Sequence, residues 1–142
     1  EKLRNKINLN FNLFKDTRPI IKTVAADLIK IITETFKSEI FIYDSFLSIF
    51  SSGGGTARHN HVNELDNDET FNLVKQKYAL VYYLSVGDQK CDKPGVLKFY
   101  EPDEEILPSK GLITIFPADR YHSSVYGGAT DRVIVGINFY LL

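Results

Sequence analysis

Cysteine is almost absent from this sequence: Cys91 is the only one among 142 residues. An internal disulfide is therefore excluded, and a chain without an oxidised scaffold suits a reducing cytoplasm, which is where we expect the protein to work. The Cys91 thiol lies in a polar stretch between Asp88 and Lys93. We expect no catalytic role for it.

Excess charge and long apolar runs are missing as well. Lysine and arginine together number 17 against 18 acids, a formal net charge of −1, so no electrostatic surplus draws the molecule to nucleic acid or to anionic lipid. No apolar run approaches the roughly 18 residues that a membrane span needs, and the first residues lack the apolar core of a secretory signal. We therefore expect neither a nucleic-acid partner nor a membrane partner.

The sequence does contain enough apolar material for one core. The hydrophobic fraction is 44%, which is sufficient for a core without disulfides or a structural metal. The length fits one domain of ordinary size, and we expect residues 1–142 to form a single domain. No pattern in the sequence indicates an oligomeric state.

Strand and helix periodicities follow one another along the chain. Apolar and polar residues alternate over residues 7–13, which predicts a strand. Asp16 or Thr17 can cap a helix that begins near Pro19 and continues at helical spacing for about 18 to 20 residues. β-Branched and aromatic residues then recur in strand-sized runs at 40–50, 78–86, 96–100, 112–116 and 132–141.

This order of elements predicts a mainly β fold. Seven or eight strands after one leading helix exclude a parallel βαβ sheet and favour two antiparallel sheets packed as a sandwich or jelly roll. The N-terminal helix is expected to buttress one sheet from outside. The polar segment 66–77 is predicted to form a short helix or a lid loop over one mouth of the sandwich.

Three histidines, His59, His61 and His122, are the main functional signal in the sequence. His59 and His61 are two residues apart, so on a strand both imidazoles project from one face and can bind one first-row metal ion. His122 follows a predicted strand and turn and can supply a third ligand. The alternative interpretation is that all three are surface residues.

Arg132 stands at the start of a strongly apolar strand, ten residues after His122. Burying a guanidinium without a partner is costly. The carboxylate of a ligand is one natural partner, and Asp131 or Glu101 could serve structurally instead.

Several motifs follow one another in the second half of the chain: Tyr82-Tyr83-Leu84, then residues 94–99 (PGVLKF), 106–111 (ILPSKG) and 116–122 (FPADRYH), and then Arg132. Together they resemble the C-terminal half of the Fe(II)- and 2-oxoglutarate-dependent dioxygenases over residues 45–142. They are most similar to the prolyl-hydroxylase-like branch and to small bacterial and phage oxygenases whose motif carries His-x-His. The resemblance implies a double-stranded β-helix, the cupin-like form of jelly roll.

The resemblance also implies roles for individual residues. In the family, a His-x-Asp/Glu pair and a distal histidine hold Fe(II), and an arginine farther along binds the far carboxylate of 2-oxoglutarate. By position, His122 matches the distal ligand and Arg132 matches the co-substrate anchor. Tyr83 matches a phenol that helps to hold the same carboxylate. Fe(II) is then the cofactor, with 2-oxoglutarate and O2 as co-substrates.

The first pair departs from the family pattern, because His59-Asn60-His61 places histidine where a carboxylate is expected. The alternative register, His61-Val62-Asn63, places asparagine there. Either three neutral histidines hold the iron, or a carboxylate completes the site, for which Glu64 is favoured over Asp66 and Asp68. We favour the set of His59, His61 and His122.

The resemblance predicts an oxygenase that hydroxylates a C–H bond of a peptide or a small molecule and releases succinate and CO2. A cupin with three histidine ligands is one alternative, although a cupin has no special need of Arg132. A non-catalytic binding module with a degenerate metal site is another. The motifs do not indicate which substrate enters the site.

Overall fold

The computed structural model describes residues 5–9 and 12–142. Strands alternate with few helical segments in the order β1 (Asn5–Leu9), η1 (Leu13–Lys15, a 3-10 helix), α1 (Pro19–Phe36), β2 (Ile40–Phe50), β3 (Gly54–His59), η2 (Leu73–Gln76, a 3-10 helix), β4 (Lys77–Ser85), β5 (Leu97–Phe99), β6 (Glu104–Ile106), β7 (Ile113–Pro117), β8 (His122–Tyr126) and β9 (Arg132–Leu141). Within the described part of the chain, no helix has the length and apolar character that crossing a membrane requires.

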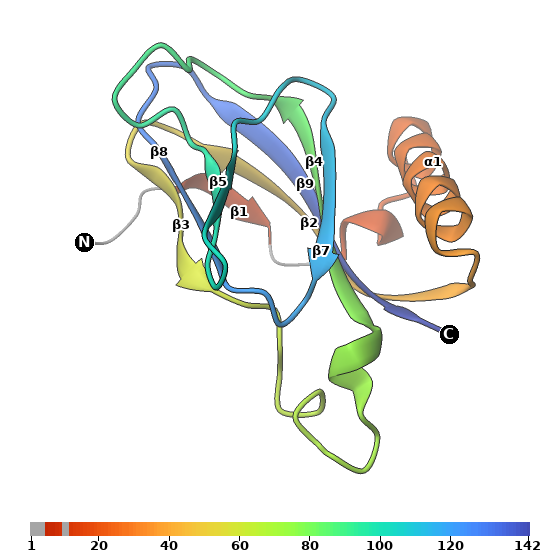
Figure 1. Cartoon of the computed structure of the whole chain (residues 1–142). Helices are drawn as coiled ribbons and strands as arrows, with labels where there is room; N and C mark the ends of the chain where they lie inside the picture. Colours follow the sequence, from red (N-terminus) through yellow and green to blue (C-terminus); the bar gives the residue numbers. More distant parts are fainter. Residues whose placement is uncertain (1–4, 10–11) are drawn as a thin grey trace.

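The strands form two antiparallel sheets. The larger sheet has the order β1-β2-β9-β4-β7, and the smaller sheet has the order β3-β8-β5-β6. The two sheets face each other, and α1 packs on the outer face of the larger one (Figure 1). Eight strands follow α1 in residues 12–142. The predicted jelly roll with a buttressing N-terminal helix is confirmed.

Helix α1 begins at Pro19 because the fixed φ of proline suits the first helical turn, where an N–H would have no partner in the helix. It ends where Lys37 turns into the left-handed region at φ 52°. The predicted length is confirmed, but the predicted cap is wrong. Arg18 occupies the N-cap position, and no side chain caps the helix. Asp16 instead accepts hydrogen bonds from the backbone N–H and the guanidinium of Arg18.

The main core fills the space between α1 and the larger sheet. Leu28 and Ile32, one turn apart on the buried side of α1, contact alternate residues of the central strands. The buried members of this core contributed by the sheet are Leu80, Val135, Ile137 and Phe139. The alternate side chains of the same strands point the other way, into the space between the two sheets.

The alternation over residues 7–13 predicts a strand that reaches Leu13, but Leu13 lies outside the N-terminal strand. Strand β1 comprises the described residues Asn5–Leu9, and Leu13 belongs to the 3-10 helix η1. Residues 10 and 11, which belong to the predicted strand, lie outside the described residues. Strand β1 pairs with β2, so this segment forms one edge of the larger sheet.

Three strands of the smaller sheet, β3, β6 and β8, have no strand-like sequence pattern. Strand β3 begins with two glycines, all three residues of β6 are exposed, and β8 carries two serines. Pairing with neighbouring strands keeps these segments extended in spite of their weak intrinsic preference. The polar segment 66–77 contains turns and η2, and its last residue, Lys77, is the first residue of β4.

Substitution of Ile32 by alanine tests the packing of α1. Ile32 is fully buried, whereas its neighbour Ile31 is 39% exposed. We expect Ile32→Ala to lower the free energy of unfolding by about 2–5 kcal/mol, because it removes buried methyl groups and leaves a cavity. Ile31→Ala is the matched control and should cost less than about 1 kcal/mol. Urea denaturation followed by circular dichroism measures both, and equal losses would contradict this packing.

Candidate metal centre

A cavity of about 280 Å³ lies between the two sheets. Both sheets contribute side chains to its wall. The lining residues are Asp44, Phe46, Ser48, Phe50, Thr56, His59, His61, Val81, Tyr83, Leu97, His122, Ser124, Arg132, Ile134 and Asn138. The five residues that the sequence analysis names as site candidates, His59, His61, His122, Arg132 and Tyr83, therefore line one cavity.

The pairing of β2 with β9 sets the long axis of this cavity. Asp44 lies opposite Asn138 in the register, and Phe50 lies opposite Arg132. The two pairs are six residues apart along each strand, or roughly 20 Å. Arg132 therefore marks one end of the cavity, and the pair of Asp44 and Asn138 marks the other.

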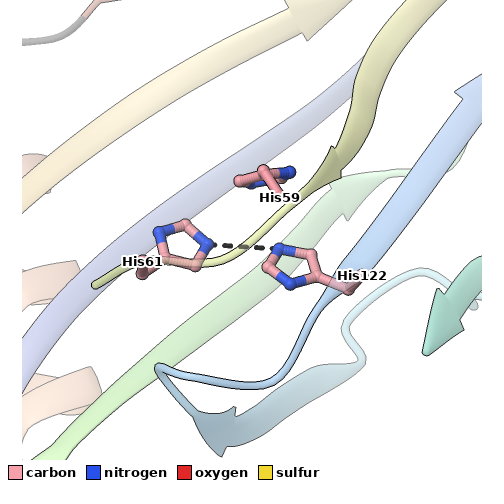
Figure 2. Close-up of side chains that lie close together, drawn as sticks. All are labelled: His59, His61 and His122. Atoms are coloured by element: carbon pink, nitrogen blue, oxygen red, sulfur yellow. Dashed lines mark hydrogen bonds between the residues drawn. The ribbon is translucent and has the colours of Figure 1, made fainter. Parts of the chain in front are cut away.

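The histidines come from two neighbouring strands and the segment that follows one of them. His59 ends β3, His122 begins β8, and the two residues are paired in the antiparallel register. His61 lies just after β3, where its backbone N–H donates to the Ala118 carbonyl at 2.8 Å. One ring nitrogen from each of the three histidines lies within 4.8 Å of the others. The Nε2 atoms of His61 and His122 are 3.2 Å apart (Figure 2).

Backbone carbonyls orient two of the three rings. Nδ1 of His59 lies 2.7 Å from the carbonyl oxygen of Ala57, and Nδ1 of His122 lies 2.9 Å from that of Arg120. A carbonyl oxygen only accepts, so each Nδ1 donates its hydrogen and each Nε2 is left with a free lone pair. Histidines that ligate metals are commonly fixed by such a bond from the other ring nitrogen.

Burial keeps the imidazoles in the form that binds metal. It lowers the pKa of His61 to about 3, and the neighbouring charges of His122, His59 and Lys77 act in the same direction. Burial also lowers the pKa of His122 to about 4, against the opposing effect of its hydrogen bond to Arg120. Both rings are therefore neutral near pH 7, and a neutral imidazole can ligate a metal without first losing a proton.

The donor set fits a first-row transition metal. Among the described residues, the group of candidate ligands consists of the three histidines. The exposed side chains of Glu64 and Asp68 do not join this group. Three imidazole nitrogens suit iron, copper, nickel or zinc, and a facial set of three protein ligands leaves further coordination positions for other ligands.

Asp66 has a structural role instead. Its carboxylate is buried, accepts a hydrogen bond from Lys77 Nζ at 2.7 Å and another from the Tyr140 hydroxyl at 2.5 Å. Its Oδ2 also accepts from the backbone N–H of Asn63. Burial opposes ionisation of Asp66, but these hydrogen bonds outweigh it and hold its pKa below the usual value. The ion pair fastens the segment that follows His61 to the first residue of β4.

Arg132 is 1% exposed and is held by backbone carbonyls. Its guanidinium donates to Val86 at 3.1 Å and to Gly95 and Pro94 at 2.6 Å each. No carboxylate of the described residues forms an ion pair with it, so the structural partners expected from the sequence, Asp131 and Glu101, do not pair with it. Burial lowers the pKa of Arg132, yet a guanidinium stays charged in proteins.

Aromatic rings surround the same guanidinium. The carbon Cζ of Arg132 lies 4.7 Å from the ring centre of Tyr126 and 5.9 Å from that of Tyr83. The Tyr83 side chain is buried, and its hydroxyl makes no hydrogen bond with any described residue. Burial raises the pKa of Tyr83 to about 12, against the opposing charge of Arg132. The phenol is therefore neutral and able to donate a hydrogen bond into the cavity.

Two glycines make room for side chains that line the cavity, because a Cβ at either position would overlap them. Gly95 has φ +77°, and a Cβ there would lie 2.2 Å from a terminal nitrogen of Arg132. A Cβ on Gly136 would lie 2.2 Å from Cζ of Phe46. Glycine at 95 thus allows the backbone to approach the guanidinium, and glycine at 136 allows the Phe46 ring to lie against β9.

Asp44 and Asn138 are cavity residues that the sequence analysis missed. The amide Nδ2 of Asn138 donates to Asp44 Oδ1 at 2.7 Å. Each interrupts a run of mainly apolar and aromatic residues, at 40–50 and at 132–141. A polar residue inside a strand that is otherwise apolar was the available signal for both.

Solved structures share this fold, although no protein-family model and no curated protein matches the sequence. A viral collagen prolyl hydroxylase from Paramecium bursaria Chlorella virus-1, solved as its 2-oxoglutarate complex, is similar with a TM-score of 0.71 and 14% identity, over 98% of this chain and 81% of that one. A prolyl hydroxylase from Trichoplax adhaerens, solved with a peptide fragment of hypoxia inducible factor, is similar with a TM-score of 0.66 and 16% identity. The match covers 95% of this chain and 61% of that one.

An oxidoreductase of the 2-oxoglutarate-Fe(II) oxygenase family from Burkholderia pseudomallei gives a TM-score of 0.62 and 14% identity, over 87% of this chain. The fold is that of the 2-oxoglutarate-dependent oxygenases. The resemblance seen in the sequence is thus confirmed at the level of fold. The chain spans 57% of the length of the Burkholderia protein.

Substitution of Asp66 by asparagine tests the buried ion pair. We expect Asp66→Asn to lower the free energy of unfolding at pH 7 by about 3–5 kcal/mol, because Lys77 is left buried without its counter-charge. Urea denaturation between pH 2 and pH 7 measures it. The exposed Asp68→Asn is the matched control and should cost less than about 1 kcal/mol.

The same experiment carries a pH signature. The pKa of Asp66 is lower in the folded state than its usual 3.8. Its contribution to stability is therefore complete from about pH 5 upward, begins to decline near the unfolded-state pKa, and is lost as the pH falls through the lower folded-state pKa. The stability difference between wild type and Asp66→Asn should shrink below pH 4. A difference that is constant with pH would contradict the assignment.

Proposed function

We propose that this protein is a non-haem Fe(II)- and 2-oxoglutarate-dependent oxygenase. One observation carries the proposal: three histidine nitrogens within 4.8 Å of one another share a cavity with a buried, charged Arg132 that has no carboxylate partner among the described residues. A metal-binding end and an anion-binding end in one cavity suit a co-substrate that is both a chelator and a carboxylate.

His59, His61 and His122 are the proposed ligands of Fe(II). The hydrogen bonds to Ala57 and Arg120 fix two of the rings through Nδ1 and leave Nε2 of each ring free to ligate the ion. When bound, the iron supplies the activation of O2 that couples decarboxylation of 2-oxoglutarate, to succinate and CO2, with hydroxylation of a C–H bond. The three ligands are neutral, so the protein itself brings no negative charge to the metal.

Arg132 and Tyr83 are the proposed anchors of the far carboxylate of 2-oxoglutarate. Arg132 gives three of its donors to backbone carbonyls, and a guanidinium carries five N–H groups, so two donors remain for a ligand. The Tyr83 hydroxyl is neutral and can supply a further hydrogen bond. Apolar side chains line the intervening wall, among them Val81, Leu97 and Ile134, and they keep water away from the charged groups.

The substrate is proposed to be a peptide or a small molecule. The Trichoplax structure contains a peptide fragment, which supports the peptide alternative. The present chain spans 61% of that protein.

Visible absorption under anaerobic conditions tests the proposal. Adding 2-oxoglutarate to the protein with Fe(II) should produce the metal-to-ligand charge-transfer band of a chelated keto acid. His122→Ala should lose the band. Arg132→Lys should need about 10- to 100-fold more 2-oxoglutarate for half of the band, because the charge remains but the planar array of donors is lost. Arg18→Ala is the control. It removes an exposed ion pair with Asp16 that does not line the cavity, so it should titrate as wild type.

Two other results would replace the proposal. Iron binding without a band would favour a cupin with three histidine ligands, which needs no anchor at Arg132. Absence of metal binding, measured by equilibrium dialysis, would favour a non-catalytic binding module. Protein folding is checked for each variant by its thermal unfolding.

Tyr83→Phe separates the phenol from the ring. The ring packs in the wall beside Phe50 and Ile134, so we expect the variant to fold as wild type. Loss of one hydrogen bond to the carboxylate should raise the half-saturating concentration of 2-oxoglutarate about three- to tenfold. The titration of the same absorption band measures it. An unchanged titration would show that Tyr83 is a wall residue only.

A further inference from the structure

We propose that Asp44 and Asn138 bind a cationic nitrogen group, an ammonium or a guanidinium, of the molecule that enters the cavity. The inference deepens the proposed function and rests on it where it names that molecule as the substrate. Binding of the cation itself requires neither iron nor 2-oxoglutarate, and it can be measured without them.

Asn138 presents a buried acceptor without a donor. The residue lies on β9 and is 6% exposed. Its Nδ2 donates to Asp44 Oδ1 at 2.7 Å, and because a carboxylate only accepts, this bond fixes which amide atom is the nitrogen. The amide oxygen Oδ1 is buried and has no hydrogen-bond partner in the described part of the chain. A buried acceptor without a donor is costly unless a ligand supplies the donor.

Asp44 lies beside this acceptor and carries the charge. One of its oxygens accepts from Asn138, and no described residue donates to the other. Asp44 supplies the one carboxylate among the described residues that line the cavity. The pair thus offers two acceptors, Asn138 Oδ1 and the second carboxylate oxygen of Asp44, and neither receives a hydrogen bond from a described residue. A group with several N–H donors and a positive charge satisfies both.

No cation of the described protein neutralises Asp44. Lys77, whose register partner Tyr140 is two residues beyond Asn138 on β9, already pairs with Asp66 at 2.7 Å. Arg132 lies at the opposite end, roughly 20 Å away along the strand. A neutral donor such as an alcohol would leave the carboxylate uncompensated, so the site favours a cation.

The pair lies at the histidine end of the cavity. Ala79 is the register partner of Asn138 on β4, two residues after Lys77. Ala118 donates its backbone N–H to the Lys77 carbonyl and accepts from the His61 N–H. The remaining wall next to the pair includes the apolar Phe46 and Val81. The occupant is therefore an amine or guanidine with an aliphatic chain, such as a basic side chain of a peptide or a small basic molecule.

Nuclear magnetic resonance titration of the apoprotein tests the inference. The probes are n-butylammonium and n-butylguanidinium, and the matched uncharged and anionic probes are n-butanol and butyrate. The side-chain amide signal of Asn138 should shift saturably with the two cations, because their N–H groups donate to its oxygen. We expect the cations to reach half-saturation at a concentration at least about tenfold lower than butanol. Butyrate should give no saturable shift.

Two variants assign the effect to the pair. Asp44→Asn keeps the volume and removes the charge, and it should weaken the binding of both cations by about tenfold or more. Asp27→Asn, at an exposed position on α1, should leave binding unchanged. The wild-type amide signal keeps the test valid even if Asp44→Asn fails to fold.

The outcomes separate this inference from the proposed function. Equal binding of butanol and the cations, or cation binding that survives Asp44→Asn, would overturn the inference. If the charge-transfer band forms and the cations do not bind, the inference alone fails. If the cations bind through Asp44 and no band forms, the proposed function alone fails.

Discussion

The two-residue alternation of β9 is the constraint on which the site depends. This strand lies between β2 and β4 and is buried on both faces. Residues 135, 137 and 139 pack with α1, while Arg132, Ile134 and Asn138 face the cavity. A shift of register by one residue would exchange the two sets, placing a guanidinium and an amide against the helix. The long pairing with β2, from Ile40 to Phe50, and the core beneath α1 prevent that exchange.

The polar residues of β9 place opposite charges at the two ends of the cavity, because Arg132 begins the strand and Asn138, beside Asp44, lies near its end. A guanidinium stands at one end, and a carboxylate and an amide stand at the other, close to the three histidines. The protein tolerates the buried guanidinium because carbonyls from three residues and two aromatic rings surround it. These contacts hold the group in place without cancelling its charge, so the field remains available to an anion.

The parts of this molecule that depend on short-range pattern are predictable from the sequence. Periodicity predicts the span of α1 and the runs that form β2, β4, β5, β7 and β9. Spacing and motif order predict the grouping of three histidines with Arg132. Strands such as β6 depend on pairing partners far along the chain, which spacing does not encode. Asp66, which the sequence offers as a possible ligand, pairs instead with Lys77, eleven residues later, because tertiary contacts set its surroundings.

The contact of Phe46 with the backbone of Gly136 has a consequence for how this cavity can diverge. The ring lies where the side chain of any other residue at position 136 would begin. A larger residue there would push the ring into the space between the sheets, with the histidines and Arg132 left unchanged in sequence. Variation at this one strand position could therefore change the length of ligand that the cavity accepts, while the polar residues at its two ends stay the same.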